Sequence, residues 1–370
     1  MTETFLTEQE AQDLAAEFIS RETTPITTQQ IIDTGTIPRL RGFHVRPGKV
    51  SDSIFGGRGS YKKGEEKVEF ENPSLQTADG TPLRIMVRTK RISTHDINRG
   101  SIPFKDQVLA LNHNFMRRLV TPFLGTSQFD VEGLSDSDVV IVAENLKTIP
   151  IEMVFRAYMA RSTTSTSLYQ AWLRGDSTFA GYGMIRDLIP NGPLPYIMDT
   201  PSTKSDDHDE TVSSEFLISR DFCSERQYLV MKNNGLAAFG AVSQFLRQRG
   251  IILVDTKTEH GVTKDERIVS QDELYTMDSS RFWLLADYKE QIEKLKRREI
   301  TELDPRSYSK EFARGFSEGE RGYTPEERAA ISARYIMGIQ HLLGRRFTPD
   351  LRPWERRVVS GLEQAVKLAA

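Results

Sequence analysis

The spacing of apolar residues along the 370-residue chain predicts a protein built from both helices and strands. Helical spacing predicts helices over residues 7–21, 107–119 and 227–248, and over most of the chain from residue 288 onward. Short apolar runs predict strands over residues 83–87, 139–143 and 251–254, and residues 152–158 form another apolar segment. Thr7, with Glu10 three residues later, predicts a capping box at the start of the first helix.

The order of these elements predicts a bilobal α+β protein. We expect an N-terminal helical extension (residues 1–36), a smaller lobe of mainly antiparallel strands (37–147), a larger α+β lobe (148–347) and a helical C-terminal tail (348–370). A hinge is expected near residues 144–150. Residues 56–64 are rich in glycine and basic side chains, which favours a hairpin tip or an insertion. The stretch that follows Tyr158, as far as Asp209, is expected to be rich in loops.

Composition and charge exclude several classes of protein. Forty-nine Lys and Arg against 52 Asp and Glu give a net charge near −3, whereas a general nucleic-acid binder is expected to have a basic excess. The single cysteine excludes an internal disulfide and a cysteine-based zinc site, which fits a reducing, cytoplasmic setting. We expect no secretory signal, and no apolar run approaches the roughly 20 residues of a membrane span. The oligomeric state stays open.

The most informative segment follows the apolar run at residues 251–254. Asp255, Lys257 and Glu259 are two residues apart, so on a strand they share one face. Two carboxylates beside an ammonium suit a magnesium–phosphate site, because hard oxygens hold the metal and the lysine meets phosphate. The alternative is a solvated edge strand with a ladder of surface ion pairs. This segment alone favours neither.

A returning strand after one hairpin would bring Asp272 beside Glu259. Soon afterwards, Arg281 closes an Asp-Ser-Ser-Arg turn, where its guanidinium presents a fork to phosphate or carboxylate. Upstream, Arg156 lies in an otherwise apolar run, so we expect it to have an anionic partner.

Other clusters are less specific when taken alone. Ser202, Thr203 and Lys204 offer two hydroxyls and a cation to a phosphate or carboxylate, although an acidic solvated loop is the favoured interpretation. Gly48-Lys49-Val50 is a short glycine–lysine turn that matches neither the P-loop nor the dinucleotide fingerprint. The basic run at residues 88–96 is by default a solvated face.

Taken together and in this order, these segments resemble the SAICAR synthetase (phosphoribosylaminoimidazole-succinocarboxamide synthase) family over roughly residues 40–347. The matching stretches are Gly48-Lys49-Val50, Arg91-Ile92-Ser93 through Asp96, Ile102-Pro103 with Lys105, Pro150 through Tyr158, Thr200 through Lys204, His208-Asp209-Glu210, Ile251 through Glu259, Asp278 through Trp283, Lys310 with Arg314, and Tyr335 through Phe347. Departures from the family pattern are Ser51 for arginine, Lys90 for an acidic residue, and Ser101, Phe104, Asp106, Ala157 and Arg161 for glycines.

The resemblance implies a SAICAR synthase-like, ATP-grasp-related fold with ATP in the cleft between a nucleotide-binding lobe and a substrate and metal lobe. It implies condensation of L-aspartate with a carboxylated aminoimidazole ribonucleotide (CAIR), with ATP and Mg²⁺ as cofactors and small molecules as the partners. Glu259 and Asp272 are then expected at magnesium, with Asp255 beside them at metal or ribose. Lys49, between Gly48 and Val50, and Lys257 would neutralise nucleotide phosphates, with adenine near Glu144 and Leu146.

The resemblance also implies the substrate contacts. The residues expected at the ribonucleotide phosphate and the two carboxylate substrates are Arg91, Ser93, Lys105, Arg156, Ser162, Ser202, Thr203, Lys204 and Arg281. Asp209 is expected at the imidazole amine, and Lys310 and Arg314 are expected to close over the site. Asp255, Lys257, Asp209 and Arg281 are the expected catalytic group. Two alternatives stay open: a phosphotransferase that acts on a hydroxyl, and a non-catalytic nucleotide-binding homologue.

Overall fold

The computed structural model describes residues 4–22, 26–204 and 210–370. The chain forms two compact units. Unit 1 comprises Met1–Asn114, Ser127–Leu146 and Ala313–Ala370, and unit 2 comprises Phe115–Thr126 and Lys147–Phe312. Within the described part of the chain, none of the helices combines the length and the apolar character that a bilayer span requires. The finer four-part division proposed from the sequence stays a prediction.

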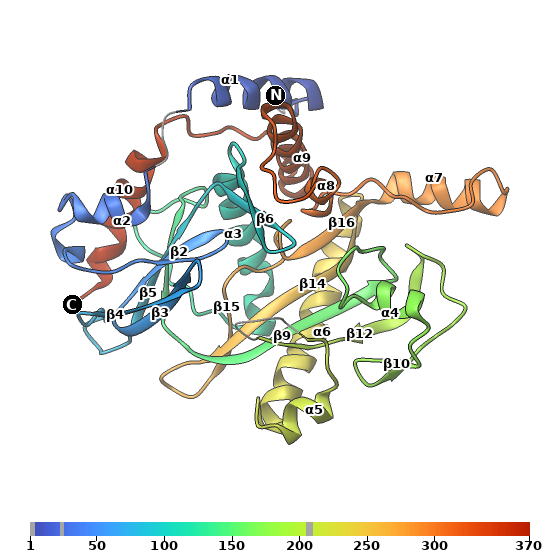
Figure 1. Ribbon diagram of the computed structural model, residues 1–370, viewed down its shortest axis with the longest axis horizontal. Coiled ribbons are helices and arrows are strands. Elements are labelled where there is room, and N and C mark those ends of the chain that lie inside the picture. Colours follow the sequence, from blue (N-terminus) through green and yellow to red (C-terminus); the bar gives the residue numbers. More distant parts are fainter. Residues whose placement is uncertain (1–3, 23–25, 205–209) are drawn as a thin grey trace. The chain divides into compact units, whose positions relative to one another are not determined.

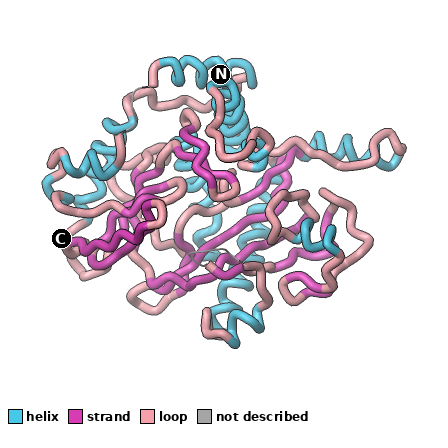
Figure 2. The backbone as a smooth tube through the Cα atoms, viewed as in Figure 1, coloured by secondary structure: helices cyan, strands magenta, loops and turns pink. Residues whose placement is uncertain are grey.

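The predicted α+β class is confirmed, because every sheet is antiparallel and helices make up much of the rest of the chain (Figures 1 and 2). The helices are α1 (Glu8–Ser20), α2 (Thr28–Asp33), η1 (Pro38–Leu40), α3 (Lys105–Leu124), α4 (Leu168–Arg174), α5 (Ser214–Ser219), α6 (Glu225–Gln248), α7 (Leu285–Lys296), α8 (Glu311–Arg314), α9 (Pro325–Leu343), α10 (Trp354–Ala365) and η2 (Val366–Leu368).

The strands of unit 1 form one four-stranded sheet, in the order β1-β2-β5-β8, and two separate hairpins. They are β1 (Arg46–Pro47), β2 (Ser51–Phe55), β3 (Gly57–Lys63), β4 (Glu66–Asn72), β5 (Leu83–Arg88), β6 (Arg91–Thr94), β7 (Ile97–Ser101) and β8 (Val140–Glu144). Residues 57–63 pair with β4, so the glycine-rich stretch belongs to a hairpin but forms one of its strands, and the tip expected over residues 56–64 is confined to residues 64–65. The core of this sheet includes Ile54, Leu83 and Ile85, all fully buried.

Helices from both ends of the chain complete the core of unit 1. Ile32 of α2 and Leu362 of α10 belong to the same apolar cluster as the four-stranded sheet. The capping box predicted at α1 is confirmed, since the Thr7 hydroxyl accepts from the Glu10 N–H at 3.2 Å and the Glu10 carboxylate accepts from the Thr7 N–H at 2.7 Å. The extensions are therefore integral parts of unit 1.

Unit 2 is built on a six-stranded antiparallel sheet, with β14 between β9 and its partners β15 and β16. Its strands are β9 (Lys147–Tyr158), β12 (Pro193–Asp199), β13 (Ser202–Thr203), β14 (Ile251–Val262), β15 (Ile268–Gln271) and β16 (Ser280–Leu284), and a separate pair is formed by β10 (Thr178–Phe179) and β11 (Tyr182–Gly183). Helix α6 packs against β9 and β14, the long strands of this sheet (Figure 1). A Cβ at Gly235 would lie 2.1 Å from the Phe155 ring, so glycine allows this close approach.

One expectation about unit 2 holds and one is corrected. The stretch after Tyr158, expected to be rich in loops, is mostly loop and turn over residues 159–204 and also contains α4 and the seven-residue strand β12. Arg281 does not lie in a turn. The turn ends at Ser279, and Arg281 is the second residue of β16, paired with Asp255. The turn residues before Arg281 gave no sign of this strand, because its partner β14 is distant in sequence.

Candidate active site

Three adjacent strands of unit 2 bring one carboxylate and two guanidinium groups together. Asp255 of β14 lies opposite Arg156 of β9 on one side and opposite Arg281 of β16 on the other. The Asp255 carboxylate accepts from Arg281 Nε at 2.9 Å and from Arg156 Nη1 at 3.2 Å. Arg156 Nε also donates to the Thr200 hydroxyl at 2.9 Å. The predicted anionic partner of Arg156 is therefore Asp255.

These groups are largely removed from solvent, which strengthens their interaction. The side chains of Arg156, Arg281 and Asp255 are 13%, 15% and 8% exposed. Burial opposes the charge of Arg281, but the Asp255 carboxylate outweighs it and raises the pKa of Arg281. Burial lowers the pKa of Arg156, and Asp255 offsets part of that change. Because the two guanidinium groups share one carboxylate, some of their N–H donors remain available to an anionic ligand.

A second charged cluster lies further along β14. Lys257 Nζ is 2.5 Å from Glu152 and 3.6 Å from Glu259, and Lys204 forms an ion pair with Glu259. Glu152 and Glu259 are directly opposite each other across the strands, a like-charge pairing that needs nearby cations. Burial disfavours the Lys257 ammonium, but Glu152 and Glu259 outweigh it and raise the pKa of Lys257.

The position of β14 excludes one interpretation of its alternating charges. A solvated edge strand would have one unpaired side, whereas β14 pairs with β9 along one side and with β15 and β16 along the other. Asp255 and Glu259 are both buried. The predicted returning strand is β15, in which Gln271 lies opposite Glu259 and Asp272 follows at once. The charges therefore lie inside the sheet.

The carboxylates of this cluster have the donor chemistry that magnesium prefers. Glu259, Asp272 and Glu152 supply hard oxygens, and the field of all three raises the pKa of Lys257. Over residues 4–22, 26–204 and 210–370, no group of three or more His, Cys, Asp or Glu side chains is arranged to hold a metal by itself. Magnesium is commonly held by one or two carboxylates plus substrate phosphates, so the residues fit a nucleotide-bound ion.

A pocket of about 330 Å³ lies beside Arg281. Its polar lining comes from Arg161, Ser162, Thr163, Tyr169, Gln170, Asn191, Arg281, Asp304, Ser307 and Glu311. Ser162, a predicted substrate residue, is buried, and its carbonyl accepts from Gln170 Nε2 at 2.8 Å. Ser202 and Thr203 form β13 against Glu152 and Ile151, which places Lys204 next to the second cluster. Asp209 lies outside the described residues.

The other predicted residues are distributed along unit 1, apart from Lys310 at the end of unit 2. Lys49 is exposed and pairs with Asp96 at 2.6 Å, and Arg91 donates to the carbonyl of Gly48 at 2.8 Å. A Cβ at Gly48 would lie 2.4 Å from the Ser51 carbonyl oxygen, so this turn requires glycine. Residue 50 follows this turn, and Glu144 and Leu146 stand at the end of β8.

Lys105 and Arg314 also belong to unit 1. Lys105 opens α3 and is fully buried, with its ammonium 5.8 Å from the centre of the Tyr335 ring. Its Nζ is therefore closed off from solvent in this conformation. Arg314 ends α8 and is half-buried.

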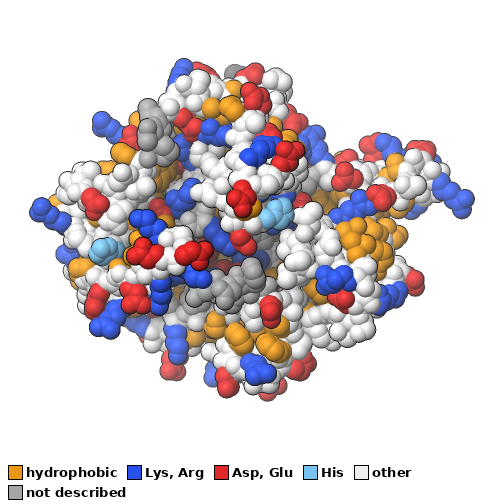
Figure 3. Space-filling model, viewed as in Figure 1, with side chains coloured by type: hydrophobic (Ala, Val, Ile, Leu, Met, Phe, Trp, Pro, Cys, Tyr) orange, Lys and Arg blue, Asp and Glu red, His pale blue; other side chains and the backbone are white. Residues whose placement is uncertain are grey.

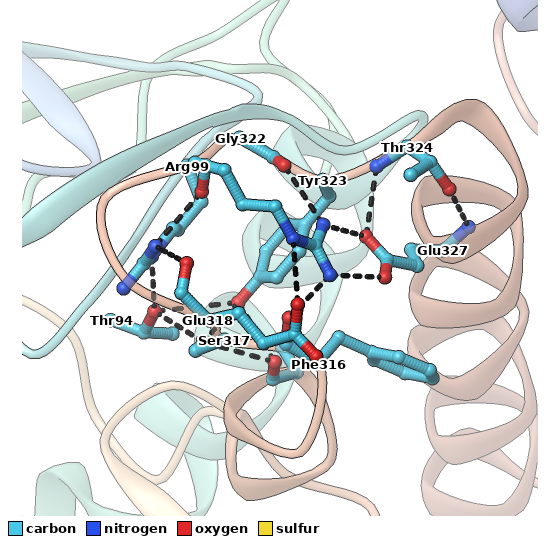
Figure 4. Close-up of polar contacts among 11 residues, drawn as sticks. Thr94, Arg99, Phe316, Ser317, Glu318, Gly322, Tyr323, Thr324 and Glu327 are labelled. Carbon is cyan, nitrogen blue, oxygen red and sulfur yellow. Dashed lines mark hydrogen bonds and ion pairs between the residues drawn. The ribbon is translucent and has the colours of Figure 1, made fainter.

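A buried polar network fixes the hairpin that carries Arg91 and Ser93. Arg99 is 2% exposed and donates to the Thr94 hydroxyl at 3.1 Å and to the Arg321 carbonyl at 2.8 Å (Figure 4). The Tyr323 hydroxyl meets Ser317 at 2.9 Å in the same network. The hairpin is thus tied to the segment that follows Arg314.

Comparison with known proteins gives the family. The model described as SAICAR synthetase matches residues 75–324. The chain belongs to the SAICAR synthetase family. The matched stretch includes β5 through α8 and so carries both charged clusters of unit 2.

Individual members of the SAICAR synthetase family are similar to the chain in sequence and in fold. The chain is 31% identical over 302 residues to "Phosphoribosylaminoimidazole-succinocarboxamide synthase, chloroplastic" of Arabidopsis thaliana, covering 78% of this chain and 70% of that protein. It is 30% identical to the synthase of Flavobacterium psychrophilum, covering 72% of this chain and 83% of that protein. In fold, the chain is similar to "SAICAR-synthase from Saccharomyces cerevisiae complexed SAICAR", with a TM-score of 0.65 and 21% identity over 89% of this chain and all of that one.

A further solved relative is "SAICAR synthetase (Type-2) in complex with ADP", with a TM-score of 0.56 and 18% identity over 83% of this chain and all of that one. At these identities the two structural likenesses bear on the fold. They support the SAICAR synthase-like class predicted for the chain.

The structure adds residues that the sequence analysis did not assign to the site. Glu152 holds Lys257, and Thr200 holds Arg156. Glu152 carries a detectable signal, because it precedes Arg156 by four residues and so lies on the same face of an otherwise apolar strand. Thr200 carries none, since its contact depends on the pairing of β12 with β9.

Proposed function

We propose that the chain condenses L-aspartate with CAIR in purine biosynthesis, consuming ATP and giving SAICAR, ADP and phosphate. The observation that carries this proposal is the buried row of ionised groups on β9, β14 and β16, inside the stretch that defines the family. The row supplies cations for anionic substrates and oxygens for a metal ion beside one another. The compartment we propose is the cytoplasm.

The chemistry needs activation because a carboxylate is a poor electrophile. A CAIR carboxylate oxygen attacks the γ-phosphorus of ATP, the bond from that phosphorus to the β–γ bridging oxygen breaks, and ADP leaves. The aspartate amine then attacks the carbonyl carbon of the acyl phosphate. A C–N bond forms, the C–O bond to phosphate breaks, and the amine loses a proton. Catalysis of such transfers is mostly positioning and neutralisation of charge.

The charged clusters suit different parts of these substrates. Arg281 and Ser162 line the pocket in unit 2, and we assign them, with Arg156 behind, to the ribonucleotide phosphate. Lys257 and Lys49 are assigned to nucleotide phosphates, and Lys204 to a substrate carboxylate. The strong pairing of Lys257 with Glu152 keeps it protonated, which a phosphate-binding role requires.

Magnesium is assigned to Glu259 and Asp272, with Glu152 alongside. The ion would neutralise phosphate charge during transfer. In this arrangement Lys204 and Lys257 balance the carboxylates of the cluster when no ion is present.

An ADP-release assay with each substrate omitted in turn tests the proposal. We expect ADP only when ATP, CAIR and L-aspartate are all present, with a product whose mass equals that of the condensed amide. ADP release without aspartate, with a phosphorylated hydroxyl product, would instead identify a phosphotransferase. Intact ATP binding without any turnover would identify a non-catalytic homologue.

A further inference from the structure

The pocket beside Arg281 contains a second arginine. Arg161 immediately precedes Ser162 and stands where the family pattern has glycine, so its side chain is an addition to this pocket. Its carbonyl accepts from Arg281 Nη1 at 2.9 Å, which fixes its backbone beside the site arginine. The Arg161 side chain therefore leaves the backbone at a fixed position next to Ser162 and Arg281, the two pocket residues assigned to the phosphate.

A single asparagine holds Arg161 and an opposing loop together. Asn191 is 5% exposed; its Oδ1 accepts from the Arg161 N–H at 2.8 Å, and its Nδ2 donates to the Leu303 carbonyl at 2.8 Å. Leu303 is fully buried, and the adjoining Glu302 forms an ion pair with Arg161 Nη2 at 2.6 Å. Asn191 therefore fixes the backbone at both ends of the Arg161–Glu302 pair, of which Arg161 lines the pocket.

This ion pair differs from the buried pair behind it. Glu302 is 64% exposed and Arg161 is 31% exposed, whereas Asp255 and Arg281 are nearly buried. An ion pair with an exposed partner contributes little to stability, so a better anion displaces Glu302 from Arg161 at little cost. Arg161 Nε is also buried and has no hydrogen-bond partner among the described residues. One donor of the fork therefore awaits a ligand.

The charges around the pocket explain why this second cation matters. Asp304 and Glu311 also line it, and Arg281 is already shared with Asp255. Asp304 and Glu311 repel an entering anion, and Arg161 can offset this repulsion because its own partner, Glu302, is exchangeable. Over the drawn face of the molecule, acidic and basic side chains are interspersed, so local placement decides the attraction (Figure 3).

We infer that Arg161 is a specificity-determining residue for the phosphate monoester of the ribonucleotide. The phosphate replaces Glu302 as its partner and lies beside Ser162 and Arg281. Glu302 is the counter-ion that holds Arg161 until the phosphate arrives. This inference rests on the proposed function, because it assigns a substrate to the same site.

Calorimetric titration of the full-length protein with ribose 5-phosphate, and separately with L-aspartate, tests the inference. Arg161→Ala should raise the Kd for ribose 5-phosphate about tenfold, because a charge-assisted fork is lost. Glu302→Gln should lower it about two- to fivefold, since Arg161 is released from its competitor. Neither variant should change the Kd for aspartate. Arg297→Ala, which breaks an exposed Arg297–Glu299 pair of 3.0 Å in the same unit, is the matched control.

The two variants are expected to act in opposite directions, which separates a ligand contact from a general loss of structure. An unchanged Kd in Arg161→Ala, weaker binding in Glu302→Gln, or an effect on aspartate alone would overturn the inference. In turnover, Arg161→Ala should raise KM for CAIR and leave kcat and KM for ATP unchanged. The expected binding shifts in a protein without aspartate-dependent ADP release would support the phosphate contact and count against the ligase.

Discussion

At the scale of single residues, the site depends on Asp255. Its carboxylate is almost fully buried and satisfies two guanidinium groups from neighbouring strands. Removing one member of a buried ionic group leaves the others without compensation in a medium of low dielectric. Asp255 therefore holds both arginines in place whatever else it contacts during catalysis.

Asp255→Asn is expected to lower the free energy of unfolding by about 3–5 kcal/mol, since the substitution removes the carboxylate that the two buried guanidinium groups of Arg156 and Arg281 share. Urea unfolding measures the change. Asp187→Asn, an exposed position in the same unit, should stay within about 0.5 kcal/mol of the parent. A loss below about 1 kcal/mol for Asp255→Asn would show that solvent reaches these arginines.

Glu259→Gln tests the proposed metal role with nearly unchanged shape. We expect turnover to fall about 100-fold or more, because charge stabilisation at the phosphates is lost. The measurement is ADP release over a magnesium titration, with exposed Glu266→Gln as the control. Near-normal turnover at every magnesium concentration would reject Glu259 as a ligand of the ion.

At the level of elements, charged residues in or next to the terminal helices form ion pairs with residues that depart from the family pattern. Lys90, where an acidic residue is usual, pairs with Glu22 after α1 at 3.1 Å. Asp106, where glycine is usual, pairs with Arg357 of α10 at 2.7 Å, and both side chains are almost completely buried. The substitutions and the extensions thus complement each other in charge.

A double-mutant cycle on Asp106 and Arg357 tests this coupling. Arg357→Met should cost about 3–5 kcal/mol of stability, because Asp106 is left buried and unpaired by this partner. Adding Asp106→Gly should restore part of that loss, giving a coupling energy above about 1 kcal/mol. Arg356→Met, on the exposed side of α10, is the control. Additive losses would show that the two helices are stabilised independently.

At the scale of the whole molecule, both chain ends contribute to the core of unit 1. Val358 and Leu362 of α10 are fully buried in the cluster that contains the four-stranded sheet. A chain lacking these residues exposes a continuous apolar surface, which favours association between molecules.

Deleting residues 352–370 is therefore expected to remove cooperative thermal unfolding and to increase binding of an apolar dye. Calorimetry and dye fluorescence measure these effects. Glu363→Ala, on the exposed face of α10, should leave both signals unchanged. A truncated chain that still unfolds cooperatively would show that α10 is dispensable for unit 1.

Local chemistry in the sequence accounts for much of what the structure contains. Capping, apolar periodicity and the alternation after Val254 identify α1, α6 and the central strand β14, since these features depend on neighbours a few residues apart. The motif order also indicates the family that the comparisons show. The roles assigned to single site residues remain predictions.

Local periodicity and motif order are enough to establish the fold class, the family and the side chains that share one face of β14. Three contacts could be known only from the folded chain: Asp255 pairs with two arginines, Glu152 pairs with Lys257, and Glu302 pairs with Arg161. Those contacts join residues far apart in the chain. Strand register and burial select them, and both are set only when the whole unit has folded.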